Sequence, residues 1–329
     1  MKVIQLTRFG GPEVLQLAQL PTPVPGPGQI LVRVRAAGVN FAETLMREDR
    51  YAMTPPLPSV PGVEAAGEIV AIGPDVSGFD LGARVAAPLF AAGLHSGGYA
   101  DHVVIPAELV VLLPDDLSFE DATALMIQGL TAAYLLKQAS PAGKTILVNA
   151  AAGGVGSILV QLARKAGAKT IVAAAGSDDK LAFARSLGAD IGIDYTQPDW
   201  TETMSAALDG EGPDIIYESV GGAITMASLA ALAPLGRIIV YGALNIQQFA
   251  LGVPDLLGLI FKNQSLTGFA LAPLLTPASL RAELGGLFEL AARGELRVTI
   301  GGSYPLERVG EAHQALEQRA TMGKLVLLP

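Results

Sequence analysis

The 329-residue chain has no cysteine, few aromatic residues and no long uninterrupted hydrophobic run. Without cysteine it can form no disulfide bond, use no thiol nucleophile and bind no zinc ion through thiolates, a composition compatible with a reducing compartment. The most apolar stretches, residues 122–136 and 251–275, are interrupted by Gln128, Asp255 and Lys262. Neither reaches the about 20 apolar residues that a transmembrane helix needs.

Positive charge is also scarce, since 22 Lys and Arg residues face 31 Asp and Glu residues for a net charge of −9. With no long basic run, the chain lacks the phosphate-neutralising face typical of nucleic-acid binding. The N-terminal segment MKVIQLTRFG alternates like a strand and lacks the apolar core and cleavage site of a secretory signal. We therefore expect a cytoplasmic protein with neither a nucleic acid nor a membrane as partner.

The chain is long enough for two domains, or for one domain split by an insertion, at about 100–200 residues per domain. Half of its residues are hydrophobic and 38 are glycine, which is typical of close-packed α/β layers. Up to about residue 117, strand-like runs are separated by proline- and glycine-rich turns, which predicts a mainly antiparallel β domain. The predicted strands are 2–6, 14–20, 30–34, 64–72, 99–105 and 110–113.

From about residue 121 to 261, strand-like and helix-like runs alternate, which predicts βαβ units and a parallel sheet covered on both faces. The predicted strands are 145–149, 170–174, 191–193, 215–217 and 237–241, with helices near 157–166, 178–187, 202–208 and 224–232. After Ser265, a strand, helices near 278–293 and 307–317, and a last strand at 324–328 are expected to rejoin the first domain. The expected fold class is α/β, with a β domain formed by residues 1–121 and 265–329 and an inserted Rossmann-type, doubly wound parallel-sheet domain at 122–264.

A glycine-rich loop follows the predicted strand 145–149 and leads into an amphipathic helix. A dinucleotide fingerprint needs a tight turn, a residue without a side chain at the pyrophosphate, and a small residue where helix meets strand. Ala151, Gly153 and Gly156 fill these positions. An ordinary strand-to-helix turn is the alternative, but the flanking elements, the further β/α steps and Gly242 at the end of the fifth strand favour dinucleotide binding.

The strand after this loop ends in Ala-Ala-Ala-Gly-Ser, residues 173–177. About 20 residues past the loop, an NAD site usually has an acid that binds the ribose diol. With no acid at this tip and with Ser177 and Lys180 nearby to bond a 2′-phosphate, the sequence favours NADPH over NADH. Asp178 and Asp179 weaken the positive field, and a solvated helix position is the alternative for Lys180.

A series of further motifs runs along the whole chain: GVNFAETLMREDRY (38–51), PGVEAAGEIVAIG (61–73), GGYADHVVIP (97–106), IQGLTAAYLL (127–136), AAAGGVG (150–156), SLGADIGIDY (186–195), ESVGG (218–222) and RATMGKLVLLP (319–329). Together they make the chain resemble the zinc-free quinone oxidoreductases of the medium-chain dehydrogenase/reductase superfamily. The resemblance implies a GroES-like β domain, an inserted Rossmann domain, and a cleft where nicotinamide meets substrate.

The resemblance also implies roles for individual residues around an NADPH cofactor. It places Asn40, Tyr51 and Thr131 near the nicotinamide, Gly153, Gly154, Val155 and Gly156 under the pyrophosphate, Ser177, Lys180 and Tyr195 around the 2′-phosphate, and Ser219, Gly242, Phe269 and Arg319 at other cofactor contacts. Zinc-dependent members of the superfamily have cysteine and histidine ligands in the β domain, where this chain has Asn40 and Val63, and the cysteine-rich structural-zinc lobe is absent. We therefore expect no metal.

Other polar residues are expected to lie outside the site. Because they lack ligand spacing, the histidines are interpreted as surface or loop residues: His95, His102 and His313. Glu43 stands where the family often has aspartate, a change from which we expect little. Arg47 and Arg50 are interpreted as solvated loop residues rather than guides for an anionic substrate.

Without a metal or a thiol, the predicted chemistry is hydride transfer from C4 of NADPH to an electrophilic carbon held about 3–3.5 Å away. Negative charge develops on the carbonyl oxygen of a quinone or an α,β-unsaturated carbonyl compound, and a hydroxyl or amide donor there lowers the barrier. Tyr51 and Asn40 are the candidate catalytic residues. The alternatives are that Tyr51 only contacts the nicotinamide and that Asn40 only braces its loop.

Two other functions stay open at this point. Enoyl-thioester reductases of the same superfamily also carry a tyrosine at the Tyr51 position, so an acyl-CoA or acyl-carrier substrate is possible, and a non-catalytic NADPH sensor would keep the same loop. From the resemblance we also expect a homodimer, formed by edge-to-edge pairing of the last Rossmann strand around residues 238–245.

Overall fold

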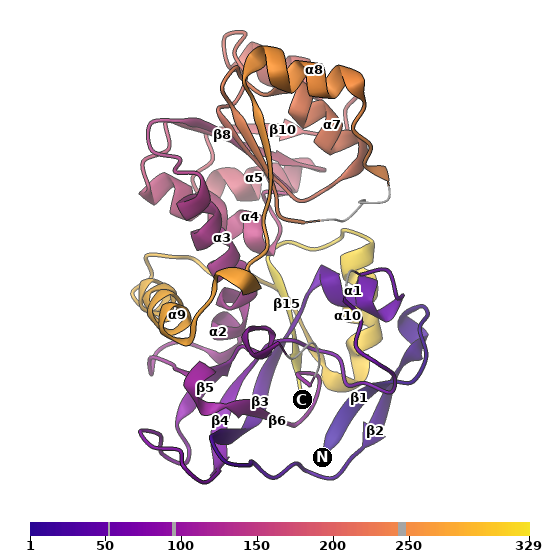
Figure 1. Ribbon diagram of the computed structural model, residues 1–329, viewed down its shortest axis with the longest axis vertical. Coiled ribbons are helices and arrows are strands. Elements are labelled where there is room, and N and C mark those ends of the chain that lie inside the picture. Colours follow the sequence, from indigo (N-terminus) through magenta and orange to yellow (C-terminus); the bar gives the residue numbers. More distant parts are fainter. Residues whose placement is uncertain (52, 94–96, 243–247) are drawn as a thin grey trace. The chain divides into compact units, whose positions relative to one another are not determined.

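The computed structural model describes residues 1–51, 53–93, 97–242 and 248–329. The chain divides into two compact units, the first formed by Met1–Leu130 and Ala272–Pro329 and the second by Thr131–Leu271 (Figure 1). The domain boundary expected from the sequence after residue 121 stays a prediction. Within the described ranges, no helix has both the length and the apolar composition required to cross a membrane.

The first unit is built on a mainly antiparallel sheet with the strand order β14-β15-β3-β4-β5-β7, in which β6 also pairs with β3. Its strands are β3 (Gln29–Val39), β4 (Ala65–Ile72), β5 (Arg84–Ala87), β6 (His102–Pro106), β7 (Val111–Leu112), β14 (Ile300–Pro305) and β15 (Lys324–Leu328). β14 pairs with β15 in parallel, and the other described pairs are antiparallel. A separate antiparallel pair is formed by β1 (Lys2–Leu6) and β2 (Leu15–Gln19).

The C-terminal strand β15 begins with Lys324, which is buried within this unit. β15 pairs with β3, and Leu325 lies opposite Val39, the last residue of β3. The chain leaves β3 through Asn40 into helix α1 (Phe41–Arg47), so residues more than 280 positions apart in sequence lie side by side. The remaining helices of this unit are α2 (Phe119–Leu125), α9 (Pro277–Ala292) and α10 (Val309–Glu317), and α3 (Ile127–Gln138) starts here and continues into the second unit.

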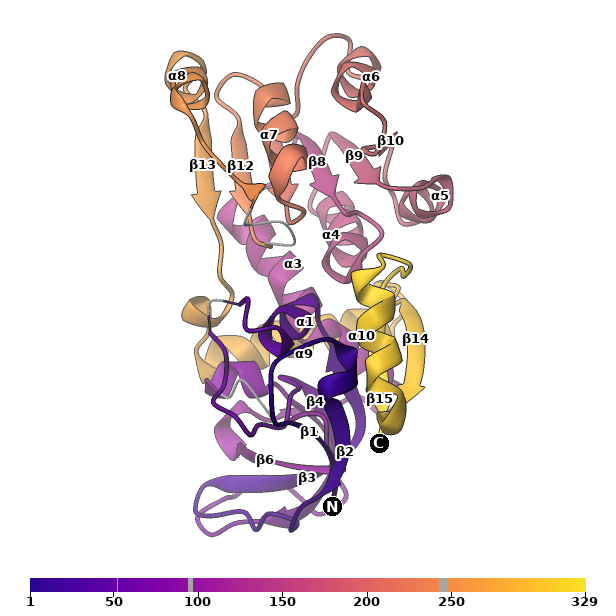
Figure 2. The same cartoon turned by 90° about the vertical axis from the view of Figure 1, so that its right-hand side faces the viewer.

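The second unit is a six-stranded parallel sheet with the order β10-β9-β8-β11-β12-β13. The strands are β8 (Thr145–Asn149), β9 (Thr170–Ala175), β10 (Ile191–Asp194), β11 (Ile215–Glu218), β12 (Arg237–Val240) and β13 (Ser265–Gly268). This is the doubly wound order of dinucleotide-binding domains, in which strand order reverses between β8 and β11. Helices α4 (Gly154–Lys165), α5 (Asp178–Ser186), α6 (Trp200–Ala207), α7 (Gly222–Ala231) and α8 (Val253–Lys262) belong to it (Figure 2). The expected fold class is confirmed.

Two expectations about the end of this sheet are wrong. The strand after Ser265 was assigned to the β domain, but it is β13 and pairs in parallel with β12. Residues 238–240 therefore lie in an interior strand with neighbours on both sides, and cannot form the sheet edge expected to pair with a second copy. The physical reason is one further crossover through α8, which adds a strand outside β12. Residues 243–245 of that expected edge lie outside the described residues.

Candidate functional site

The glycine loop lies at the carboxyl end of β8, beside the point where strand order reverses. Gly153 is the N-cap residue of α4, and its amide donates to the carbonyl oxygen of Ala150 at 2.9 Å. The first-turn amides of α4, which include Gly154, Val155 and Gly156, have no partner within the helix. Unpaired amides beside the partial positive charge of a helix N-terminus are chemically suited to a phosphate or pyrophosphate group.

Gly153 and Gly156 serve different purposes in this loop. A methyl group added at Gly156 would lie 2.4 Å from the carbonyl oxygen of Ala150 and 2.7 Å from the Cα atom of Ala151. Glycine is required there because the helix backbone packs directly against the end of the strand. At Gly153 the nearest atom would be the Ala150 oxygen at 3.2 Å, so the fold crowds this position less than it crowds Gly156.

The neighbouring strand β9 ends in a neutral tip. Ser177 is the N-cap of α5 and accepts a hydrogen bond from the Lys180 amide at 3.4 Å. A methyl group added at Gly176 would lie 3.5 Å from the ring of Tyr195, which follows β10. The structure thus brings Ser177, Lys180 and Tyr195 to one end of the sheet, with no acidic side chain at residues 175–177.

Ser219, Gly242 and Phe269 follow β11, β12 and β13 at the same end of the sheet. A methyl group at Gly242 would lie 2.6 Å from the Cβ atom of Ser219, so these two residues are in close contact and position 242 needs glycine. The amide of Phe269 donates to the carbonyl oxygen of Val240 at 2.9 Å, which extends the β12–β13 pairing by one step.

In the first unit, Asn40 lies in a buried polar network. Its Oδ1 accepts hydrogen bonds from Lys324 Nζ and from Gln128 Nε2, both at 2.6 Å. Its Nδ2 donates to Glu64 Oε1 at 2.9 Å, and Lys324 Nζ lies 2.5 Å from the same oxygen. The second Glu64 oxygen accepts from the Ile127 amide at 3.0 Å. Both lone pairs of Asn40 Oδ1 are thus occupied, while its amide nitrogen has one further hydrogen to donate.

A second buried polar cluster links α1 to Tyr99 and to His313 of α10. Glu43 Oε2 accepts from the Asn40 amide at 2.8 Å and from the Tyr99 hydroxyl at 2.6 Å. Tyr99 Oη lies 3.1 Å from His313 Nε2, and Arg47 Nη1 lies 3.3 Å from His313 Nδ1. Because Arg47 can only donate, Nδ1 is the acceptor and Nε2–H donates to Tyr99. Burial raises the pKa of Glu43 to about 7, whereas burial and the Arg47 guanidinium lower the pKa of His313 to about 3.

The other predicted site residues have different degrees of exposure. Thr131 is buried on α3, three residues after Gln128. Tyr51 is 38 % exposed, on the segment that follows α1. Arg319 is exposed and has a φ of 54° just after α10.

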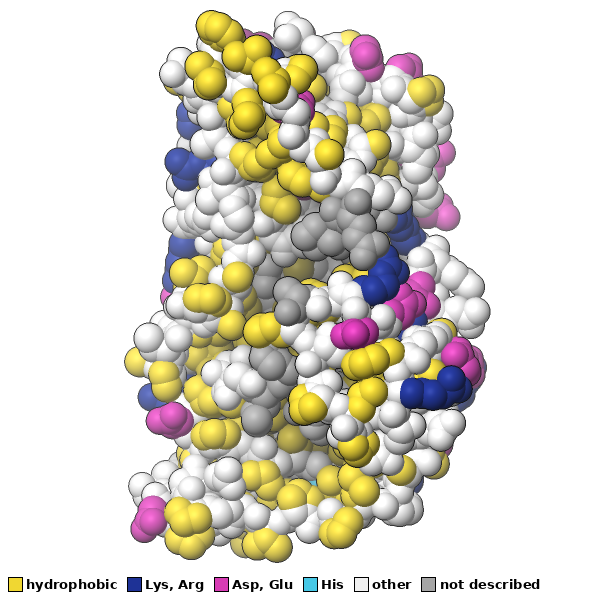
Figure 3. All heavy atoms as spheres, turned by 45° about the vertical axis from the view of Figure 1, so that its right-hand side comes forward, with side chains coloured by type: hydrophobic (Ala, Val, Ile, Leu, Met, Phe, Trp, Pro, Cys, Tyr) yellow, Lys and Arg dark blue, Asp and Glu magenta, His cyan; other side chains and the backbone are white. Residues whose placement is uncertain are grey.

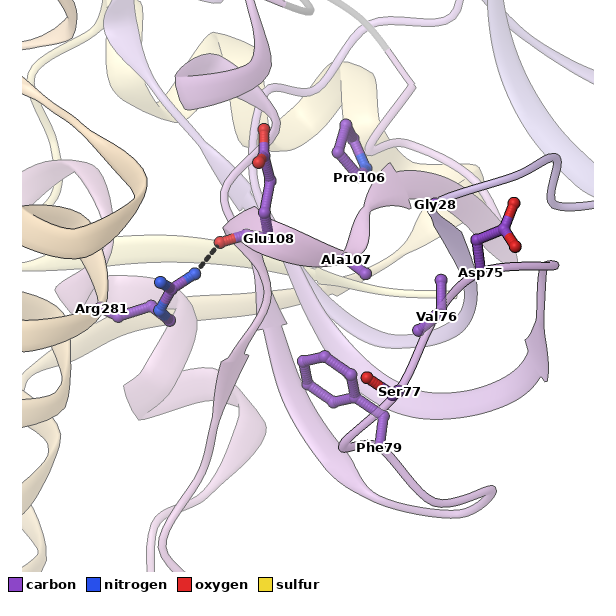
Figure 4. A pocket seen from close by; sticks show the side chains of 9 residues that line it. All are labelled: Gly28, Asp75, Val76, Ser77, Phe79, Pro106, Ala107, Glu108 and Arg281. Atoms are coloured by element: carbon purple, nitrogen blue, oxygen red, sulfur yellow. Dashed lines mark hydrogen bonds between the residues drawn. The ribbon is translucent and has the colours of Figure 1, made fainter.

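A separate pocket of about 570 Å³ lies on the first unit (Figure 4). Its lining residues are Gly28, Asp75, Val76, Ser77, Phe79, Pro106, Ala107, Glu108 and Arg281, and Arg281 donates to the Glu108 carbonyl oxygen beside it. None of these residues belongs to the predicted site.

Comparison with known proteins matches both units to described families. Residues 26–115 match the alcohol dehydrogenase GroES-like domain, and residues 154–284 match the zinc-binding dehydrogenase family. A quinone oxidoreductase of Pseudomonas aeruginosa is 38% identical, over 100% of this chain and 99% of the relative. A 2-haloacrylate reductase of a Burkholderia species is 34% identical, over 97% of this chain and 96% of the relative.

A solved structure of Escherichia coli quinone oxidoreductase complexed with NADPH is 33% identical, covers 100% of both chains and superposes with a TM-score of 0.91. The chain belongs to the quinone oxidoreductase family of the medium-chain dehydrogenase/reductase superfamily. The family named from the sequence motifs is confirmed.

The expectation that this protein holds no metal ion stays a prediction. Among the described residues, no group of three or more His, Cys, Asp and Glu side chains is placed to hold a metal ion. Glu64, which accepts a hydrogen bond from Asn40, is also paired with the ammonium group of Lys324. A lysine from the C-terminal strand therefore provides the positive charge next to this carboxylate.

Two predictions from the sequence about polar residues of this protein are wrong. Arg47 was interpreted as solvated, but its side chain is 1% exposed and pairs with Glu48 and Glu317. His313 was interpreted as a surface or loop residue, but it is fully buried on α10. Both lie on helices that pack against each other, and an isolated helical Arg or His has no sequence mark of this burial. His95 lies outside the described residues.

The sequence reasoning also overlooked three residues around Asn40: Glu64, Gln128 and Lys324. Glu64 lies in the motif at 61–73, Gln128 in the motif at 127–136 and Lys324 in the motif at 319–329. A charged or amide residue inside an otherwise apolar run was the available signal, since burying such a group is costly without a partner. The sequence could not show that the three partners were one another.

Proposed function

We propose that this protein is an NADPH-dependent oxidoreductase that reduces quinones or α,β-unsaturated carbonyl compounds by hydride transfer, without a metal ion. The observation that carries the proposal is the glycine loop at the strand-order reversal, beside a β9 tip that has serine where an NAD site has an acid. The names of the relatives support the acceptor class, since quinones and haloacrylates both have a C=C bond conjugated to a carbonyl or carboxyl group.

The second unit supplies the proposed cofactor-binding residues. The α4 N-terminus, with Gly153, Gly154, Val155 and Gly156, would hold the pyrophosphate through backbone amides, and Ser177, Lys180 and Tyr195 would hold the 2′-phosphate. Ser219, Gly242, Phe269, Thr131 and Arg319 are proposed as further contacts. NADPH supplies the hydride when bound, and the protein positions it and excludes water.

Asn40 and Tyr51 are proposed to act on the acceptor oxygen. The remaining Nδ2 hydrogen of Asn40 can donate to an oxygen that gains negative charge, whereas its Oδ1 is unable to accept another bond. Tyr51 is exposed enough to reach a bound ligand and to donate its hydroxyl proton. The enoyl-thioester alternative uses the same tyrosine and hydride chemistry, and differs in the acceptor alone.

Steady-state oxidation of NADPH with naphthoquinone, a linear enone and crotonyl-CoA tests this function. We expect turnover with the first two acceptors. Preferred turnover of crotonyl-CoA would assign the enoyl-thioester activity instead, and NADPH binding without turnover of any acceptor would favour a sensor. A Tyr51→Phe variant is expected to bind NADPH normally and to lose about 10²-fold or more in kcat if the hydroxyl donates a proton.

The cofactor preference has its own test, in which Ser177 is replaced by aspartate. Aspartate caps a helix as well as serine does, so α5 is retained while a carboxylate faces the 2′-phosphate. We expect the Kd for NADPH to rise about 10- to 100-fold, with little change for NADH, because like charges at such a site cost several kcal/mol. Ser118→Asp, at the equivalent N-cap of α2, is the matched control, and equal effects on both cofactors would contradict the assignment.

A homodimer is proposed through the true sheet edge, β13, together with α8. No described residue of α8 is buried, and its exposed apolar side chains are Val253, Leu256, Leu257, Ile260 and Phe261. Figure 3 shows hydrophobic side chains gathered on the second unit at the top of the view. An exposed strand edge beside an apolar helix is suited to an isologous contact with a second copy.

The cytoplasmic location expected from the sequence stays a prediction.

A further inference from the structure

Gln128 has a buried hydrogen-bond acceptor with no partner among the described residues. The residue is 8% exposed and lies in the first turn of α3. Its Nε2 donates to Asn40 Oδ1 at 2.6 Å, but its Oε1 accepts no hydrogen bond. An unsatisfied buried acceptor costs about 1–3 kcal/mol, so each one in a folded protein calls for an explanation, such as a bound ligand.

The surrounding charges determine which end of each amide points where. Lys324 can only donate, so the atom of Asn40 that faces it must be the oxygen, and the Asn40 nitrogen faces Glu64. Gln128 must then present its nitrogen to Asn40 Oδ1, because an oxygen there would face another oxygen. The unpaired atom of Gln128 is therefore a carbonyl oxygen, and it requires an N–H or O–H donor.

The position of Gln128 indicates where that donor comes from. Residues three apart on a helix share a face, so Gln128 shares a face of α3 with Thr131, which is proposed to lie at the nicotinamide. Asn40, bonded directly to Gln128, is the other residue proposed there, and its remaining N–H is proposed to donate to the acceptor oxygen. Gln128 Oε1 is left to accept from a second donor, and the NH2 group of the primary carboxamide on the nicotinamide ring is such a donor.

We propose that Gln128 is a cofactor-binding residue whose Oε1 accepts a hydrogen bond from the carboxamide NH2 group of the nicotinamide ring. The Lys324–Glu64 pair acts as a positioning pair, since it sets the orientation of Asn40 and through it that of Gln128. This inference rests on the proposed NADPH function. A hydroxyl group of the acceptor substrate is the other source of a donor, and the test separates the two.

The test compares NADP⁺ with its 3-acetylpyridine analogue, in which a methyl ketone replaces the carboxamide and removes the N–H donor. Kd values for both are measured by calorimetry with the wild type, with Gln128→Met and with the control Gln138→Met, at the other end of α3. We expect the preference for NADP⁺ over the analogue to fall about 3- to 10-fold in Gln128→Met, the value of one hydrogen bond, and to stay unchanged in Gln138→Met.

Each outcome has a distinct meaning. An equal preference in the wild type and Gln128→Met overturns the inference while NADP⁺ binding still supports the proposed function, whereas failure of the wild type to bind NADP⁺ defeats the function itself. A raised KM for the quinone with an unchanged preference would assign the donor to the substrate and also overturn the inference. Gln128→Asn has a side chain shorter by one methylene group, which moves the acceptor oxygen away from the ligand. It is expected to show the same fall in the preference for NADP⁺, and it replaces Gln128→Met in the test if the methionine variant does not fold.

Discussion

Replacing Lys324 by methionine tests the buried ion pair that holds Asn40. The side chains of Lys324 and Glu64 are 2% and 0% exposed, and the ammonium group also donates to Asn40. Methionine fills a similar volume but leaves the Glu64 carboxylate buried without its countercharge. Removing one partner of a buried pair costs about 3–5 kcal/mol, so we expect a loss of this size in the free energy of unfolding of the first unit.

Hydrogen exchange followed by mass spectrometry measures this loss within one unit of the protein. Amides of β15 and β3 that exchange through unfolding of the first unit should exchange roughly 10²- to several 10³-fold faster in the variant, at about 1.4 kcal/mol per factor of ten. Amides of β8 and β9 in the second unit are the internal control. The single tryptophan, Trp200, lies in that second unit, so its fluorescence cannot replace this measurement.

Two further variants decide whether the buried charge is the cause. Arg308→Met breaks an exposed pair with Glu311, whose side chains are 57% and 53% exposed, and should cost less than about 1 kcal/mol. Lys324→Met combined with Glu64→Gln removes both charges and should recover most of the loss. If Lys324→Met costs no more than Arg308→Met, or if the double variant recovers nothing, the reasoning is refuted.

Three other perturbations follow from the geometry. Gly153→Ala should keep the wild-type unfolding temperature but weaken NADPH binding about 10-fold or more. Gly156→Ala should lower the free energy of unfolding by about 1–3 kcal/mol, because its added methyl group meets backbone atoms. Calorimetry measures unfolding and binding, and the same effect from both variants would contradict their separate roles. His313→Gln tests the lowered pKa of His313, which is about 3 in the folded protein against an ordinary value of 6.5. Between these pH values the unfolded wild type binds a proton that the folded protein does not, so the free energy of unfolding of the wild type falls as pH decreases. The variant should therefore gain stability over the wild type by up to about 1.4 kcal/mol per pH unit from pH 6.5 toward pH 3, and parallel pH profiles of thermal unfolding would refute it. Phe261→Asp on α8, where this side chain is 80% exposed, should halve the mass seen by light scattering, while Leu81→Asp on the first unit should leave it unchanged.

Local sequence signals predicted the second unit well. The strand predicted at 145–149 coincides with β8, and the helix predicted at 178–187 differs from α5 by one residue. Strand periodicity, capping residues and glycine spacing act over a few residues, so they can be read without knowing the fold. The loop between β8 and α4 was predicted for the same reason, since its chemistry depends on adjacent backbone atoms.

The sheet edge could not be predicted in this way. Both β12 and β13 are strands of four residues, and which of them forms the edge depends on where the crossover through α8 places the last strand. Strand order is a property of the whole sheet rather than of any one segment. The expected dimer contact moved from residues 238–245 to β13 and α8 for this reason alone.

The sequence by itself therefore determined the family, the α/β class and the glycine loop, because each depends on residues that are close together in the chain. Only the tertiary structure decided the surroundings of Asn40, where Glu64, Gln128 and Lys324 meet from three separate segments. Buried polar groups are stabilised by the partners that the fold brings to them. Those partners can lie 284 residues away, as Lys324 does from Asn40, and no local pattern records them.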